Sequence, residues 1–285
     1  QVTARLGESK SPLTEDELME ALHDPRFHVR LEAIVSIARM KPSPRLRQAM
    51  IETLYGTELA LSDLAAWALG RTGDAQAIPA LRATLASPYS SIRAQAVGAL
   101  VALNDEEMAP LFLAQLRREE DRGLQMAYAS SLGRLQATEA VDDLLALLYH
   151  FRNEGARAEL ALDLARLHGD EHYYVQLTRQ MRNDPGTATA QAVNAFHRQL
   201  DKQGLLDAET LTLLEKCSEA LARGNLNQGA RLLGELLAQL PLEERLDATG
   251  VAIARACATE LRRSGDEHPE YLFLALHTLH VAWRG

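Results

Sequence analysis

Arginine recurs along the first two thirds of this sequence in a regular series. Arg39 and Arg71 lie 32 residues apart, and Arg134, Arg166 and Arg198 continue the series in steps of 32 after one position taken by alanine. A guanidinium group pairs with carboxylate or phosphate through two parallel hydrogen bonds. If the chain stacks its repeats, the five arginines form a row suited to an acidic peptide or a phosphorylated segment. We call these five residues the arginine row.

A structural interpretation of the arginine row stays open, and so does the role of the nearby Trp67. Cations near the C-terminus of a helix are favoured by the helix dipole, typically by ~0.3–1 kcal/mol, and this alone could select arginine. The formal net charge of −9 also weakens the case for an anionic partner. Trp67 lies one helical turn before Arg71, where it is either an aromatic anchor for the partner or a core residue.

The elements that position the row are predicted from apolar residues with the same period. Residues 29, 33 and 37 form one helical stripe, and its last position recurs at a spacing of 31 or 32 as Ile37, Leu69, Leu100, Leu132, Leu164 and Phe196. An earlier helix in each repeat keeps its own register through Leu22, Leu54, Leu85, Leu116 and Leu148. The period predicts six helical pairs stacked as an α-solenoid over residues 13–200.

Several motifs in these repeats resemble HEAT repeats, in the short form named after phycobilisome lyases. They are Asp24-Pro25 with Val29-Arg30 and Ala33, Ser87-Pro88 with Ile92-Arg93 and Ala96, and the helix ending Ala68-Leu69-Gly70-Arg71-Thr72-Gly73-Asp74. The resemblance covers about two thirds of the chain and implies an interaction surface. Because relatives of the lyase type act on a tetrapyrrole attached to cysteine, it also permits a chromophore lyase or chaperone.

A second set of arginines opens the later helix of alternate repeats, at Arg30, Arg93 and Arg157. An arginine at this position can bind the carboxylate or carbonyls of the preceding turn, and Asp24 is suitably placed for Arg30. We expect these three residues to hold the turns of the fold.

Histidine and cysteine residues are expected to be structural. His168 and His172 flank Asp170 and Glu171 in what the pattern predicts to be a solvated polar turn. Two further pairs, His277 with His280 near His268 and Cys217 with Cys257, are expected to take part in packing or, for the histidines, to face solvent. No metal site is predicted.

The sequence contains no GxSxG, glycine-rich phosphate loop or HExxH motif, so no catalytic residue and no cofactor are expected. Hydrophobic residues make up 47% of the chain and aromatic residues 5%, which favours an all-helical protein. The acidic charge argues against nucleic acid, and no apolar run is long enough to cross a bilayer. Two cysteines without a CxxC motif suit a reducing compartment.

The sequence therefore predicts an all-α protein in three parts. Residues 1–12 are a linker, residues 13–200 a right-handed superhelix of about six HEAT-like pairs, and residues 201–285 a C-terminal helical cap or subdomain. The predicted function is a cytoplasmic, non-catalytic scaffold that binds a protein or peptide on the face of the second helices. The alternatives are a regulatory or accessory domain of a larger protein, including a membrane protein, and the chromophore lyase or chaperone.

Overall fold

The computed structural model describes residues 14–204 and 206–284, and every regular element in these ranges is a helix. The predicted linker, residues 1–12, lies outside the described residues. The chain divides into two compact units, the first ending at Leu135 and the second beginning at Gln136. We call them the N-terminal and the C-terminal unit.

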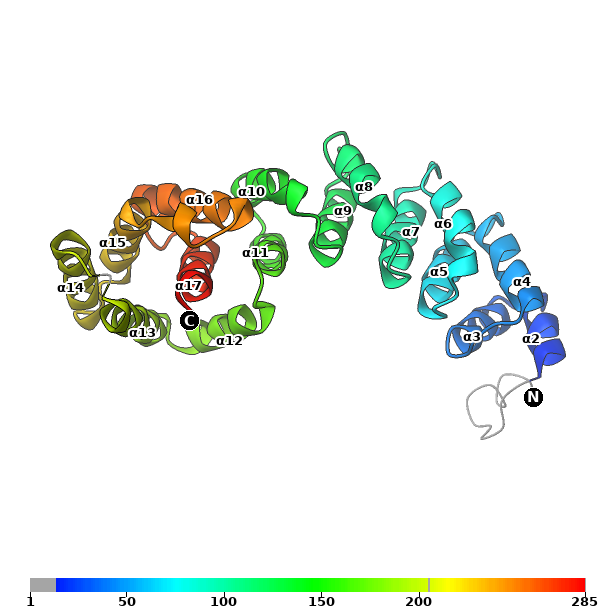
Figure 1. The fold of residues 1–285 in the computed structure, drawn as a ribbon. Helices are drawn as coiled ribbons and strands as arrows, with labels where there is room; N and C mark the ends of the chain where they lie inside the picture. Colours follow the sequence, from blue (N-terminus) through cyan, green and yellow to red (C-terminus); the bar gives the residue numbers. More distant parts are fainter. Residues whose placement is uncertain (1–13, 205, 285) are drawn as a thin grey trace. The chain divides into compact units, whose positions relative to one another are not determined.

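The N-terminal unit consists of four helical pairs in its described part (Figure 1). The pairs are α2 (Glu15–Leu22) with α3 (Phe27–Ile37), α4 (Pro44–Leu54) with α5 (Leu59–Arg71), α6 (Ile78–Thr84) with α7 (Ser90–Ala102), and α8 (Ala109–Leu116) with α9 (Arg122–Arg134). Short 3-10 turns, η1 (Ala75–Ala77) and η2 (Glu106–Met108), precede α6 and α8. The second helices α3, α5, α7 and α9 pack side by side in chain order.

The predicted apolar stripe forms the core between these helices. Ile37, Leu69, Leu100 and Leu132 are all completely buried. At Gly70 the backbones of α5 and α7 come so close that a Cβ atom there would lie 2.5 Å from the Cα of Ala99. The absence of a side chain at Gly70 is therefore a condition for the close packing of α5 on α7.

Two of the turns that join repeats in the N-terminal unit contain a left-handed residue. Gly73 and Asn104 follow α5 and α7 with φ angles of 70° and 54°. The aspartate after each of them forms an ion pair with an arginine of the preceding first helix, Asp74 with Arg47 and Asp105 with Arg82. The Gly-Asp helix ending therefore ties one repeat to the next through its carboxylate.

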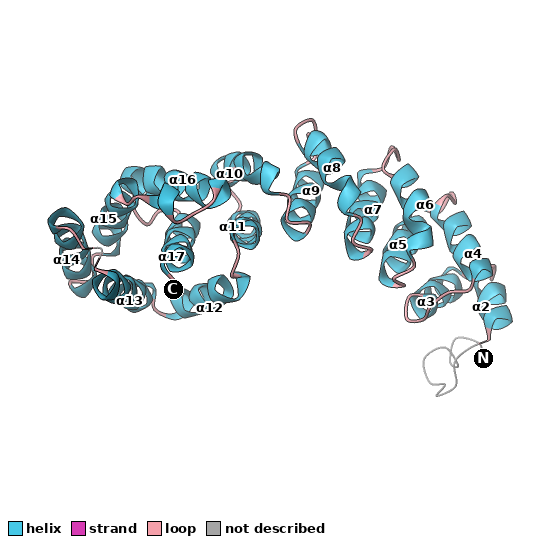
Figure 2. Ribbon diagram, viewed as in Figure 1, coloured by secondary structure: helices cyan, strands magenta, loops and turns pink. Residues whose placement is uncertain are grey.

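The C-terminal unit contains two more helical pairs and four further helices. They are α10 (Val141–His150) with α11 (Glu154–His168), α12 (Glu171–Asn183) with α13 (Pro185–Gln203), then α14 (Ala208–Ala222), α15 (Leu226–Gln239), α16 (Ala248–Ser264) and α17 (Pro269–Trp283). The 3-10 turns η3 (Thr138–Ala140) and η4 (Leu242–Glu244) precede α10 and α16. Helix α16 packs against α10 and closes a ring of helices within this unit (Figure 2).

Helix α17 lies in the middle of that ring. It packs against α11, α12, α13, α15 and α16, and eleven of its fifteen residues are buried. A helix that is apolar around its whole circumference is stable only when neighbours cover every side.

The all-α fold and the six helical pairs predicted from the sequence are confirmed. Where the sequence pattern sets a boundary at residue 200, helices from both sides of that position pack together in one unit.

Candidate functional site

Three members of the arginine row lie along one edge of the N-terminal unit. Arg71 and Arg134 are the last residues of α5 and α9, and Arg39 follows the end of α3 by two residues. All three are exposed, and Ala102 takes the equivalent position in α7. Because α3, α5, α7 and α9 pack in order, the three arginines share one edge, with a gap at α7.

These three arginines differ from six other arginines of their unit. Ion pairs with carboxylates engage Arg26, Arg30, Arg45, Arg47, Arg82 and Arg93. Among the described residues, the side chains of Arg39, Arg71 and Arg134 have no hydrogen bond or ion pair. No side-chain hydrogen bond therefore accounts for arginine at these three helix ends.

Trp67 is a surface residue, with 38% of its area exposed. The guanidinium carbon of Arg71 lies 5.9 Å from the centre of the Trp67 ring, within range of a cation–π interaction. The neighbouring helix α7 has Gly98 at the position equivalent to Trp67, and a Cβ there would have no atom within 4 Å. The indole ring therefore stands beside a part of the surface that is free of side chains.

The other two members of the row have partners within the chain. Arg166 pairs with Asp163 at 2.8 Å and with Glu171 at 2.9 Å. Burial by itself lowers the pKa of Arg166, but these two carboxylates outweigh it and raise that pKa. Arg198 lies inside α13 and not at its end, and it donates to the carbonyl of Asn194 at 3.3 Å. The helix dipole therefore does not explain arginine at position 198.

The second set of arginines was predicted to hold the turns that precede the second helices, and the structure corrects this for Arg30. Arg93 donates to the carbonyls of Ser87 and Pro88 in the preceding turn, at 3.0 and 3.2 Å, as predicted. Arg30 does not bind Asp24. It forms two hydrogen bonds to Glu58 at the start of α5. Asp24 is held instead by the backbone and side chain of Arg26, two residues away, which leaves Arg30 to reach the next repeat.

Arg157, the third member of this set, is buried in the C-terminal unit. It donates to the carbonyl of Leu148 at 2.9 Å and forms an ion pair with Glu270 of α17 at 3.0 Å. Only 5% of the Arg157 side chain and 7% of the Glu270 side chain are exposed. A buried charge requires a partner of this kind, so the pair fixes α17 against α11.

The prediction of a solvated turn at His168–His172 is wrong for His168 and Asp170. Asp170 accepts hydrogen bonds from His280 at 3.2 Å and from Arg284 at 2.7 Å, and its carbonyl is bound by His277 at 3.2 Å. The His168 ring packs edge-on against His277, with 5.5 Å between centroids. Burial lowers the pKa of both His168 and His277 to about 4. The turn is covered because α17 returns to it from 107 residues later in the chain.

The other predicted structural residues are placed as follows. His172 is exposed and bonds to Gln176, and the predicted packing role of Cys217 and Cys257 is confirmed by their complete burial. Within residues 14–204 and 206–284, no group of three or more histidine, cysteine, aspartate or glutamate residues could hold a metal ion. None of the helices in these ranges combines the length and the apolar content required to cross a bilayer.

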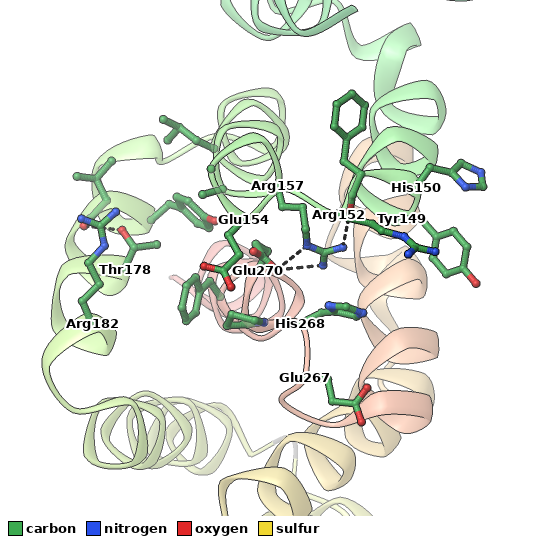
Figure 3. A pocket seen from close by; sticks show the side chains of 18 of the residues that line it. Tyr149, His150, Arg152, Glu154, Arg157, Thr178, Arg182, Glu267, His268 and Glu270 are labelled. Atoms are coloured by element: carbon green, nitrogen blue, oxygen red, sulfur yellow. Dashed lines mark hydrogen bonds and ion pairs between the residues drawn. The ribbon is translucent and has the colours of Figure 1, made fainter. Parts of the chain in front are cut away.

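The sequence pattern missed a groove of about 1160 Å³ in the C-terminal unit. Figure 3 shows its lining, which comes from the end of α10, from α11 and α12, and from the region where α16 passes into α17. Five arginines lie in this lining: Arg152, Arg157, Arg179, Arg182 and Arg263. They come from different elements and follow no repeat. The one local signal was the spacing of three between Arg179 and Arg182, which places both on one side of a helix.

Comparison with known proteins identifies the repeats. The family model of HEAT repeats matches residues 54–127, so the HEAT-like repeats predicted from the sequence are confirmed there. Among solved structures, the chain is similar to the complex of CpcE and CpcF of phycocyanin lyase from Nostoc sp. PCC7120. The identity is 19%, the match covers 94% of this chain and 96% of that chain, and the TM-score is 0.48. The comparison with curated proteins gave no match.

Proposed function

We propose that this HEAT-repeat chain is a non-catalytic scaffold that binds an acidic segment of a protein partner on the N-terminal unit. The contact surface is the face lined by α3, α5, α7 and α9, with Arg39, Arg71 and Arg134 as its cations and Trp67 as its aromatic anchor. One observation carries the proposal. These three arginines are exposed and unpaired among the described residues, whereas six other arginines of the same unit are paired.

The chemistry of the surface suits a carboxylate-rich partner. Each free guanidinium can form two parallel hydrogen bonds to a carboxylate, which gives direction as well as attraction. Tryptophan and arginine are the side chains most often found at the centre of protein interfaces. Gly98 and Ala102 leave room beside Trp67 for an apolar side chain of the partner.

The proposal rests on the three arginines of the N-terminal unit alone. Arg166 and Arg198 belong to the same series in the sequence, but each already has a partner in the chain. Recruiting Arg166 would break two ion pairs to Asp163 and Glu171, and that cost opposes partner binding.

The test is charge reversal at the three positions, Arg39→Glu, Arg71→Glu and Arg134→Glu together. Immobilised wild-type and variant chains are compared for capture of proteins from the native host by mass spectrometry. We expect the captured acidic partner to fall at least tenfold, with the melting temperature within about 2 °C of wild type, because none of the three side chains holds the fold. A matched control reverses three exposed cations of the C-terminal unit, Lys216, Arg223 and Arg255.

Equal capture by wild type and the row variant would contradict the proposal. Loss of capture by the control variant as well would mean that net charge, and not this surface, selects the partner. Unfolding of the row variant would assign the three arginines a structural role.

A further inference from the structure

The C-terminal unit contains a cationic groove that neither the repeat pattern nor the function proposed above uses. We propose that this groove is a second binding site and that it takes an extended peptide segment with separated acidic residues. Its cations are Arg152, Arg179 and Arg182, which are all exposed. In the part of the chain that the structure describes, none of the three has an ion pair.

The other two arginines of the lining are neutralised within the unit. Arg157 is paired with the buried Glu270, and Arg263 is paired with Glu260 at 2.8 Å. Arg263 also lies over the Tyr149 ring, with 5.4 Å from its guanidinium carbon to the ring centre. Because these two arginines are already paired, the cations left for a ligand are those at positions 152, 179 and 182.

The free cations do not converge on one point. Figure 3 shows Arg152 and Arg182 on opposite sides of the groove, with Arg157, Glu154 and Glu270 between them. A single phosphate can reach only donors that meet around it, so this arrangement does not form a small anion site. A ligand with negative groups some distance apart can reach both walls.

The side chains in the middle of the groove indicate which residue of a peptide would fit between the two cationic walls. Glu154 lies between Arg152 and Arg182 (Figure 3), which disfavours negative charge at the centre, and Glu267 also lines the groove. Tyr149 is 54% exposed, and Val175 and Phe273 add half-buried apolar surface. The lining therefore suits an apolar or hydrogen-bond-donating residue between two acidic ones.

The size of the groove also favours a peptide. Pockets for small molecules usually measure about 300–1,000 Å³ and enclose most of the ligand. The groove, at about 1160 Å³, lies above that range and is partly open to solvent. An extended chain that lies in such a groove can place alternate side chains on its two walls.

The test uses a fluorescein-labelled peptide, (Glu-Glu-Tyr)4, and fluorescence anisotropy with the full chain. To remove binding at the arginine row, the parent protein carries Arg39→Glu, Arg71→Glu and Arg134→Glu, and the titration is repeated on the wild-type chain. The groove variant adds Arg152→Glu and Arg182→Glu, at two exposed side chains without an ion pair in the described chain. The matched control instead adds Lys216→Glu and Arg223→Glu, which change the charge equally outside the groove.

We expect the groove variant to raise the Kd of the peptide at least tenfold and the control variant to change it less than twofold. The peptide (Gln-Gln-Tyr)4 should bind the parent at least tenfold more weakly than (Glu-Glu-Tyr)4. Hydrogen exchange should slow on peptide binding at residues 149–158 and 175–182. If the charge reversal disturbs the circular dichroism spectrum, Arg152→Gln with Arg182→Gln replaces it and should weaken binding at least threefold.

Three results would overturn the proposal. The groove variant could bind like the parent, or the control variant could weaken binding as much as the groove variant. Inorganic phosphate at 5 mM could also displace the peptide completely in sodium chloride of matched ionic strength, which would make the groove a small anion site. Failure of this test leaves the function proposed for the N-terminal unit standing, because the groove lies on a different unit.

Discussion

Arginine residues at the two ends of the second helices take very different environments. Arg157 is almost completely buried and is paired with Glu270, whereas Arg71 is exposed and its guanidinium lies 5.9 Å from the centre of the Trp67 ring. A buried guanidinium without its carboxylate leaves an uncompensated charge in the core, which costs far more than an exposed one. The distinction separates arginines that hold the fold from those available to a partner.

Removal of one member of the buried pair should therefore be costly. We predict that Glu270→Leu lowers the free energy of unfolding by about 3–5 kcal/mol, since it leaves Arg157 unpaired in the core. Replacement of both residues, Arg157→Met with Glu270→Leu, should recover most of that loss. Urea unfolding followed by circular dichroism measures both. A loss below about 1 kcal/mol for Glu270→Leu alone would show that the pair does not hold α17.

At the scale of single elements, the N-terminal unit depends on close helix contact at one glycine. A methyl group at Gly70 would lie 2.5 Å from the Cα and 2.7 Å from the Cβ of Ala99, so α5 and α7 would have to separate. Gly98 in α7 offers a control, because a Cβ there meets nothing within 4 Å.

We predict that Gly70→Ala destabilises the protein by about 1–3 kcal/mol, the usual cost of overpacking a core. Gly98→Ala should instead be neutral or stabilise it by up to about 1 kcal/mol, because alanine favours the helix. Thermal unfolding of the two variants measures both changes in stability. Equal effects of the two substitutions would contradict the packing described for α5 on α7.

The packing of helix α17 involves two histidines whose protonation should make the stability of the fold depend on pH. His168 and His277 have a pKa of about 4 in the folded chain because burial disfavours their charged forms, and about 6.5 when unfolded. The charged and titratable groups facing them include Asp170, Arg284 and Asp247, and the rings of Tyr173 and Tyr174 also pack against His277. Their neutral forms therefore stabilise the fold above pH 6.5, and this stabilisation is lost as the pH falls to 4.

We predict that the free energy of unfolding falls by about 5 kcal/mol between pH 6.5 and pH 4, because the two histidines contribute together and one pKa unit corresponds to about 1.4 kcal/mol. The pKa of Asp170 is already below its ordinary value of 3.8, so that carboxylate contributes only at lower pH. Urea unfolding at several pH values measures the slope. His168→Gln with His277→Gln should flatten it, while the exposed His172→Gln should not. A steep slope in the double variant would assign the effect to other groups.

The sequence predicted the elements well because their signal is local and repeated. Leu69 and Leu100 recur at one period, and each is buried in the stripe that the period predicts. The packing of α17 against α11 was not predicted. Glu270 and Arg157 lie 113 residues apart, and no local sequence pattern near either residue indicates that they form an ion pair. The available clue was that residues 269–283 are apolar on all sides, which requires a helix surrounded by others.

At the scale of the whole molecule, the second helices of the two units differ in what they contact. In the C-terminal unit, α11 and α13 pack against α17 of the same chain. In the N-terminal unit, α5 and α9 end in exposed arginines and a third exposed arginine follows α3, and none of the three has a carboxylate partner among the described residues. That contrast is the basis for assigning partner binding to the N-terminal unit.

The most direct test of this assignment is hydrogen–deuterium exchange of the chain with and without its captured acidic partner. We expect slower exchange at residues 35–40, 67–73 and 130–135, which contain Arg39, Arg71 and Arg134. Trp67 emission should shift on binding, and the buried Trp283 provides the constant background. Protection confined to residues outside the N-terminal unit, with no change in Trp67 emission, would contradict the account.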